Sequence, residues 1–351
     1  VSNTTEAGIV FDENDHNPEI LPNTFPGKLT VLLHHHFAYF REDLTRELKV
    51  LPCELIEKNG DKLKDCVLKY IELWSFSRDF AQWVESNVIF YNTLVDRIVP
   101  GFPKENIHAI QEKLGYDDNL VVKAEPFHLW VIEGPETLKN QLPLIDAGLN
   151  VIFTDDLAPF RTRKVRILNG THTAMVPIAY LNGFTEVREV VQDKDLRKFL
   201  NQIIFEEIIP TLDMPEEELA TYANKVLERF KNPFIKHKLL DISLNSISKF
   251  KVRVLPSILS YLERYQKVPE GLAIAFAYLI VFYKGEHASR SIPIKDDETV
   301  VSFFKEAWSS KGVELTITRI LSNEALWGVN LEKEVLLTNF LEEKVMATTN
   351  V

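Results

Sequence analysis

The sequence has few of the features that mark several large classes of protein. Its two cysteines, Cys53 and Cys66, are too few for a disulfide scaffold and lack the paired spacing with histidine that a structural zinc site requires. It contains no apolar run of the roughly eighteen residues that a membrane-spanning helix needs. The first residues have neither the basic start nor the apolar core of a secretion signal. We therefore expect a cytoplasmic protein in a reducing compartment.

Positive charge is also scarce, since 40 Lys and Arg stand against 51 Asp and Glu, with a formal net charge of -11. Because nucleic acids and anionic membranes attract basic surfaces, we expect neither as a partner. A small molecule is the expected ligand. The consecutive His34, His35 and His36 would point in three directions on a helix, about 100° apart, so we predict no metal site.

The 351 residues are too many for one ordinary core, and the sequence changes character near residue 160. Residues 1–160 alternate strand-like and helix-like segments, which is typical of an α/β layer structure. Residues 161–351 read as mainly helical. Strands are predicted near 49–56, 127–132 and 150–154, with strand character also at 314–320; helices are predicted from Lys28, over 63–74, from an Asp193 cap to Pro210, and over 215–230, 255–266 and 271–283.

The stretch KVRILNGTH, from Lys164 to His172, places polar side chains in an otherwise apolar run. In an α-helix Asn169 and His172 share a face, while Lys164 lies at the far side of the arc and needs its long stem to reach them. A desolvated lysine can act as a base near neutral pH, an asparagine can donate to a carbonyl oxygen, and a histidine can hold a hydroxyl. Gly170 would let a ligand or another backbone come close.

Each of these residues also has an ordinary structural interpretation. Asn-Gly is most often a turn, a lone histidine is usually a hydrogen-bonded structural residue, and a lysine at the start of a helix is usually solvated. Residue types alone leave both interpretations open.

The motifs around this stretch resemble those of the polyol-specific long-chain dehydrogenases, the mannitol dehydrogenase family. The resemblance rests on RKVRILNGTHTA together with TEAG at 5–8, PCELIEKNG at 52–60, VDRIVP at 95–100 and EPFHLWVIEG at 125–134, all in the family's order. It implies the end of a Rossmann-like nucleotide-binding domain followed by a helical substrate domain. The variants SNTTEAGI, PCELIEKNG and SKFKVRVLPS resemble the branch that interconverts altronate and tagaturonate with NAD.

The resemblance also implies roles for individual residues. Lys164 would be the general base, Asn169 would hydrogen-bond the reacting oxygen and His172 would orient the substrate. Asp96 would relay protons, although an ion pair with Arg97 is the structural alternative. The remaining matches are Thr5 and Glu6 near the cofactor and Lys249 at the substrate.

Two departures from the family pattern bear on the substrate. The asparagine of the family's C-D-N is missing at Glu54-Leu55, and Asn59 is the nearest substitute donor. The substrate arginine of mannitol-type members is also missing, with Asp241 at about its place. A sugar acid would need cations for its carboxylate, and Lys249, Lys251, Arg253 and His237 are candidates, although Lys251 and Arg253 could also form a solvated basic helix end.

The thirteen glycines include no G-x-G pair, the turn that holds a dinucleotide pyrophosphate, and the chain opens on VSNTTEAGI without methionine. We therefore expect that the first, phosphate-binding half of the nucleotide domain is not in this chain, and that the chain alone is inactive. Fructuronate or mannitol specificity is the alternative within the enzyme class. A non-catalytic helical domain derived from a dehydrogenase is the alternative outside it.

Overall fold

The computed structural model describes residues 1–5, 7–40, 43 and 47–349. It divides into two compact units, the first made of Val1–Gly101 and Leu120–Arg161, the second of Phe102–Asn119 and Thr162–Val351. The chain passes from the first unit to the second within helix α6 (Ala158–Arg163). Residues 102–119 group with the second unit although they interrupt the first in the sequence. Among the described residues, no helix has both the length and the apolarity to cross a bilayer.

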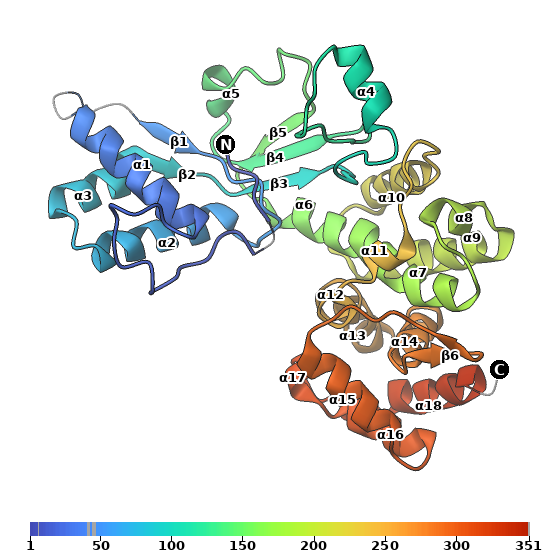
Figure 1. The fold of residues 1–351 in the computed structure, drawn as a ribbon. Helices are drawn as coiled ribbons and strands as arrows, with labels where there is room; N and C mark the ends of the chain where they lie inside the picture. Colours follow the sequence, from blue (N-terminus) through green and yellow to red (C-terminus); the bar gives the residue numbers. More distant parts are fainter. Residues whose placement is uncertain (6, 41–42, 44–46, 350–351) are drawn as a thin grey trace. The chain divides into compact units, whose positions relative to one another are not determined.

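The described residues of the first unit form a two-stranded sheet, a three-stranded sheet and helices (Figure 1). Strands β1 (Leu48–Val50) and β2 (Val88–Phe90) are parallel, β3 (Thr93–Asp96) and β4 (Leu129–Glu133) antiparallel, and β4 and β5 (Val151–Thr154) parallel. One further backbone hydrogen bond extends each of two ladders, from the Tyr91 amide to the Val50 carbonyl at 3.0 Å beside β1 and β2, and from the Glu133 amide to the Asn92 carbonyl at 2.9 Å beside β3 and β4. Ser2 adds a parallel bridge to Pro52.

Three helices pack their apolar stripes together in this unit: α1 (Phe25–Tyr39), α2 (Asn59–Leu73) and α3 (Arg78–Asn87). In α2 the buried side chains recur every three or four residues, at Leu63, Val67, Tyr70 and Ile71, as one helical face requires. In α1, Leu33 and Phe37 are buried, whereas Leu32 is 65% exposed. A short helix, α5 (Leu138–Gln141), lies between β4 and β5 in the sequence.

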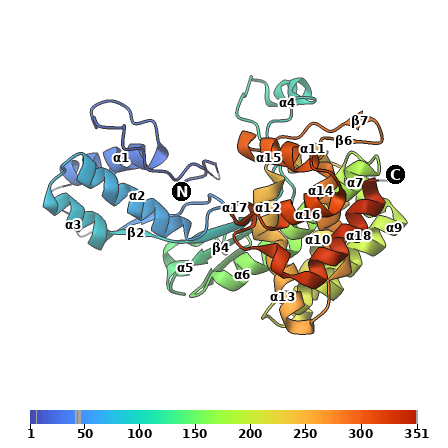
Figure 2. The same ribbon diagram turned by 90° about the horizontal axis from the view of Figure 1, so that it is seen from below.

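The second unit is mainly helical, and α14 (Glu270–Phe282) runs through its middle, with α7 and α18 packed against it (Figure 2). Pro269 and Tyr283 flank it as the N-cap and C-cap residues. Its side chains are apolar on every side, as in a fully buried helix. The other helices are α4 (Ile107–Leu114), α7 (Gly170–Leu181), α8 (Val187–Gln192), α9 (Lys194–Asn201), α10 (Glu216–Phe230), α11 (Leu239–Ile242), α12 (Ser246–Arg253), α13 (Leu255–Tyr265), α15 (Glu298–Trp308), α16 (Val313–Leu321), α17 (Glu324–Trp327) and α18 (Val335–Thr349).

Short irregular elements complete this unit. They are the π-helical turns η1 (Lys164–Asn169) and η2 (Gln202–Ile208), the 3₁₀ turns η3 (Ile209–Thr211) and η4 (Leu331–Lys333), and a hairpin of β6 (Glu286–His287) and β7 (Arg290–Ser291).

The predicted fold class, an α/β part followed by a mainly helical part, is confirmed. The predicted Asp193 cap is present, since its carboxylate accepts from the amides of Asp195 and Leu196. The strand character predicted at 314–320 is wrong, because the segment forms helix α16. Its residues Thr316, Ile317, Ile320 and Leu321 are buried at helical spacing, so tertiary packing overrides the strand preference of β-branched side chains.

Candidate active site

Lys164 and Asn169 are the first and last residues of η1, a π-helical turn between α6 and α7. The three elements follow one another in the sequence without a break in helical backbone. An α-helix would separate residues five apart by about 140°, because each residue turns about 100°. A π turn is wider and closes i to i+5 hydrogen bonds, so it brings the two residues onto the same side. The π turn therefore narrows the angular gap that an α-helix would leave between Lys164 and Asn169.

The turn sits in dry surroundings. Lys164 and Asn169 are each 9% exposed, and Ile167 between them is fully buried. His172 follows Asn169 by three positions, hence on the same face, and is 5% exposed. Within the described part of the chain, the Asn169 side-chain amide makes no hydrogen bond and His172 Nε2 is buried without a partner. Polar groups buried in this way are costly, so open donors and acceptors here are a sign of a ligand site.

The His172 ring is held by two neighbours. It stacks on Phe230 of α10 at 4.1 Å between ring centroids and meets His237 edge-on at 4.8 Å. Burial lowers the pKa of His172 well below its ordinary value, and the nearby His237, Arg253, Arg229 and Lys249 lower it further. Burial also lowers the pKa of His237. His172 is therefore a neutral imidazole at physiological pH, able to hold a hydroxyl group.

The same interactions place several basic side chains around His172. Three of them, His237, Lys249 and Arg253, are the predicted substrate-binding residues. Lys249 also donates to the Ile242 carbonyl at 3.1 Å. Sequence reasoning missed the fourth, Arg229, because a basic residue in the last turn of a helix is common for reasons of the helix dipole alone. The cluster favours an anion beside the neutral imidazole.

Gly170 allows another segment of the chain to approach this turn closely. A Cβ at Gly170 would lie 2.9 Å from the carbonyl oxygen of Arg253, at the end of α12. The close approach is therefore that of another backbone segment. It ties the Asn169 end of η1 directly to the helix that carries Lys249 and Arg253.

In the first unit, Asn59 is fully buried at the start of α2 and its amide is fully used. Nδ2 donates to the carbonyls of Pro52, Glu54 and Thr93, and Oδ1 accepts from the amides of Gly60 and Thr93. No hydrogen-bonding capacity is left for a substrate. Asn59 fastens the loop after β1 to β3 instead of replacing the absent family donor.

The other predicted residues of the first unit differ in burial. Asp96 closes β3, opposite Leu129, and is 2% exposed. The neighbouring Arg97 directs Nε to the carbonyl of Glu125 at 2.9 Å. Thr5 is exposed, and its carbonyl accepts from the Gly8 amide at 2.9 Å. Glu6 lies outside the described residues.

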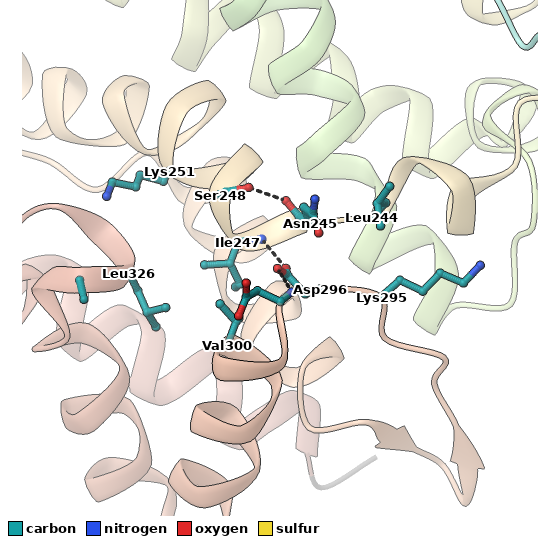
Figure 3. Close-up of a pocket in the computed structure, with 11 residues that line it drawn as sticks. Leu244, Asn245, Ile247, Ser248, Lys251, Lys295, Asp296, Val300 and Leu326 are labelled. Carbon is teal, nitrogen blue, oxygen red and sulfur yellow. Dashed lines mark hydrogen bonds between the residues drawn. The ribbon is translucent and has the colours of Figure 1, made fainter. Parts of the chain in front are cut away.

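A separate cavity of about 670 Å³ lies beside α12 in the second unit (Figure 3). Its polar groups largely satisfy one another, since Ser248 donates to the Asn245 carbonyl, and Asp296 accepts from the amide of Ile247 and the hydroxyl of Tyr283. The labelled Lys251 and Lys295 extend away from its centre in opposite directions. This cavity lacks the open polar atoms found near Asn169 and His172, so we do not assign the substrate to it.

Comparison with known proteins identifies the family of this chain. The model of the mannitol dehydrogenase Rossmann domain matches residues 2–146, and that of the mannitol dehydrogenase C-terminal domain matches residues 156–349. The chain belongs to the mannitol dehydrogenase family. It is therefore an oxidoreductase with a Rossmann-like first part and a helical second part, as the resemblance implied.

Its relatives include altronate oxidoreductases. The chain is 46% identical to that of Bacillus subtilis and 45% identical to that of Phocaeicola vulgatus, covering 97% and 94% of this chain and 70% of each relative. Two solved structures share the fold. The ternary complex of Pseudomonas fluorescens mannitol 2-dehydrogenase with NAD and D-mannitol has a TM-score of 0.73 at 23% identity, and substrate-free D-sorbitol dehydrogenase has 0.75 at 24%, each covering 98% of this chain and 70% of the other.

Proposed function

We propose that this protein is an NAD-dependent oxidoreductase that interconverts D-altronate and D-tagaturonate. One observation carries the choice of a sugar acid over a neutral polyol: the cluster of His237, Lys249, Arg253 and Arg229 around the buried His172. The altronate oxidoreductases at 41–46% identity support the same substrate. The family motifs and ranges support residues 1–160 and 161–351 as its nucleotide-binding and substrate domains.

The charged members of this cluster, Lys249, Arg253 and Arg229, suit a carboxylate for physical reasons. A substrate anion pairs with guanidinium and ammonium groups through charge-assisted hydrogen bonds, which are about twice as strong as neutral ones. Lys249 and Arg253 lie on α12, whose end contacts Gly170. The carboxylate would thus be held by the element that also supports Asn169.

In the oxidation direction, we assign Lys164 to take the proton of the substrate hydroxyl. Asn169 then donates its amide hydrogen to the same oxygen, which gathers negative charge as the proton leaves. The neutral His172 holds a neighbouring hydroxyl and so fixes which carbon faces the reaction. Bound NAD supplies the chemistry of a hydride acceptor. Loss of the hydride from carbon and the proton from oxygen leaves the carbonyl of the keto acid, and Asp96 is proposed to relay the proton onward.

The first unit fits the nicotinamide side of such a cofactor. The segment at Ser2 runs parallel to residues 51–53, and ligands of parallel α/β sheets bind beyond the carboxyl ends of the strands. The Gly8 amide donates to the Thr5 carbonyl at 2.9 Å, and a Cβ at Gly8 would lie 1.9 Å from Thr4 Oγ1, so Thr4 packs closely against Gly8. From the family motif, Thr5 and Glu6 are proposed to hold the cofactor.

A substrate panel tests the function. The protein as its gene encodes it is assayed for NAD reduction with altronate, mannonate, mannitol and sorbitol. We expect the highest kcat/KM for altronate. A higher value for mannonate or mannitol would replace altronate by one of the alternative specificities, and no turnover of any of them would favour a non-catalytic helical domain.

A charge variant tests the role of the cluster separately. Lys249→Met should raise the KM for altronate roughly tenfold or more and change the KM for an uncharged polyol much less, since only the sugar acid carries the carboxylate. The neighbouring Lys251→Met on the same helix is the matched control. Equal effects of the two substitutions would remove Lys249 from the carboxylate site.

A further inference from the structure

Helix α10 contacts both ends of the stretch that carries the three candidate catalytic residues. At the near end, Arg163, directly before Lys164, forms an ion pair through Nη1 with Glu218 Oε1. The Arg163 guanidinium also lies over the ring of Tyr222, 4.5 Å from its centroid. At the far end, Phe230 stacks on His172 at 4.1 Å. Glu218, Tyr222 and Phe230 all belong to α10.

The contacts of Arg163 with Glu218 and Tyr222 can fix the orientation of the Arg163 side chain. Arg163 is 8% exposed and Tyr222 7% exposed, so the cation rests on the ring away from most solvent. An arginine in this setting presents a planar group that both stacks and pairs, which fixes its orientation more tightly than a lysine would. Glu218 is about half exposed, so its charge guides Arg163 without being a buried ion that the fold must compensate.

These contacts set how the chain winds between Arg163 and His172. The two residues are nine positions apart, and each is fixed to a different part of one regular helix. A π turn has a wider winding than an α-helix, so it persists only where surrounding contacts favour it. The α10 contacts fix both ends of the segment that contains η1, and the Arg253 backbone packs on Gly170 within it.

We propose that Arg163, Glu218 and Tyr222 are positioning residues that keep η1 in its π-helical form and thereby hold Lys164 on the side of Asn169. The proposal rests on the proposed function only for its kinetic readout. Displacing a catalytic group by about 1 Å can cost roughly a hundredfold in rate, so a change in winding should be visible in turnover.

The test uses the protein as its gene encodes it and compares four variants. Glu218→Gln removes the charge and keeps the shape, and Tyr222→Leu removes the ring. Tyr222→Phe retains the ring and should therefore keep most of the kcat that Tyr222→Leu loses. Glu228→Gln is the matched control, because Glu228 lies on the same helix and pairs with Lys231 at an exposed site.

We expect Glu218→Gln and Tyr222→Leu to lower kcat with altronate roughly tenfold, to change KM less than about twofold and to shift the pH profile of kcat, because Lys164 is moved while the anion cluster is not. Glu228→Gln should match the wild type. If the first two variants lower only the melting temperature and leave kcat and its pH profile unchanged, the contacts are merely structural and the proposal is wrong.

A second readout separates this proposal from the proposed function. The rate at which an amine-reactive reagent labels Lys164, measured by mass spectrometry as a function of pH, needs no substrate. We expect the Lys164 labelling profile to change in Glu218→Gln and not in Glu228→Gln. If wild-type protein turns over none of the sugar acids but the labelling profile still changes, the function is wrong and the positioning role stands. An unchanged labelling profile overturns the positioning role.

Discussion

The chain contains two Asn-Gly pairs that begin helices, and they have opposite surroundings. Asn59-Gly60 opens α2 in the first unit, and Asn169-Gly170 lies where η1 passes into α7 in the second. Both asparagines are buried, at 0% and 9% exposure. The Asn59 amide is committed to backbone groups of its own unit, whereas the Asn169 amide makes no hydrogen bond within the described residues.

The two glycines, in contrast, have the same structural role. A Cβ at Gly60 would lie 2.5 Å from the Tyr91 carbonyl oxygen, and one at Gly170 would lie 2.9 Å from that of Arg253. In both pairs the glycine admits a neighbouring backbone. The dipeptide therefore reports close packing in either place, and only the state of the asparagine amide distinguishes a structural pair from a candidate catalytic one.

Charge separates the two sites further. Near Asn59, the buried Glu54 carboxylate accepts from Ser2 Oγ and from the amide and hydroxyl of Thr4. Near Asn169, the side chains that act on His172 are basic. An anionic, fully hydrogen-bonded cluster stabilises a loop, whereas a cationic one beside open donors suits an anionic substrate.

The largest effect should come from Lys164, the proposed general base. We expect Lys164→Ala to lower turnover of altronate by roughly 10²–10⁴-fold, the usual cost of losing a general base. The melting temperature should stay near that of the wild type, because burying an ammonium group is itself unfavourable. Added primary amine should restore part of the rate. Near-normal turnover with an unchanged pH profile would make Lys164 a structural residue.

The two asparagines should respond to truncation in opposite ways. Asn169→Ala should lower kcat roughly 10²–10³-fold, as does loss of one donor to a developing oxyanion, with little change in unfolding free energy. Asn59→Ala should lower the unfolding free energy by about 3 kcal/mol or more, because it leaves several buried backbone groups without partners.

Urea unfolding and steady-state kinetics of both variants measure this pair of outcomes. The structural and catalytic assignments would be reversed if Asn169→Ala unfolded at a lower urea concentration than the wild type while Asn59→Ala kept its stability and had a lowered kcat.

The glycines should give smaller and similar effects on stability. Gly60→Ala and Gly170→Ala each bring a methyl group against a backbone carbonyl, which should lower the unfolding free energy by about 1–3 kcal/mol. Gly60→Ala, with the shorter contact, should cost more. Gly170→Ala should also lower kcat, because the methyl pushes η1 from the end of α12. Equal turnover of the two variants, each corrected for its folded fraction, would show that the Gly170 contact does not support the site.

The smallest effect concerns pH. The pKa of His172 lies well below its ordinary value in the folded protein, so below about pH 6.5 the unfolded chain binds a proton that the folded chain does not. Stability should therefore fall with decreasing pH, by up to about 1.4 kcal/mol per pH unit from this group. Denaturant unfolding between pH 7 and 5 should show a flatter dependence in His172→Asn. The exposed His108→Asn serves as control, and an identical slope in all three proteins would contradict this prediction.

Much of the fold could be predicted from local pattern. Periodicity located α2, α10, α13 and α14, and the Asp193 cap marked the start of α9, because these signals depend on residues close in sequence. The same dependence on local signals explains the wrong prediction at 314–320. The helix there depends on burial against distant residues, which local propensity does not report. The sequence also identified the family, through motifs that extend along most of the chain.

The sequence by itself determined which residue types stand at Lys164, Asn169 and His172, and hence what chemistry the stretch can perform. Tertiary structure decided that Lys164 and Asn169 are joined by a π turn, which we propose is held by contacts with α10 and with the end of α12. It also decided that Asn59 fastens a loop while Asn169 keeps its amide open. Both outcomes involve contacts between residues far apart in the sequence, which no local pattern encodes.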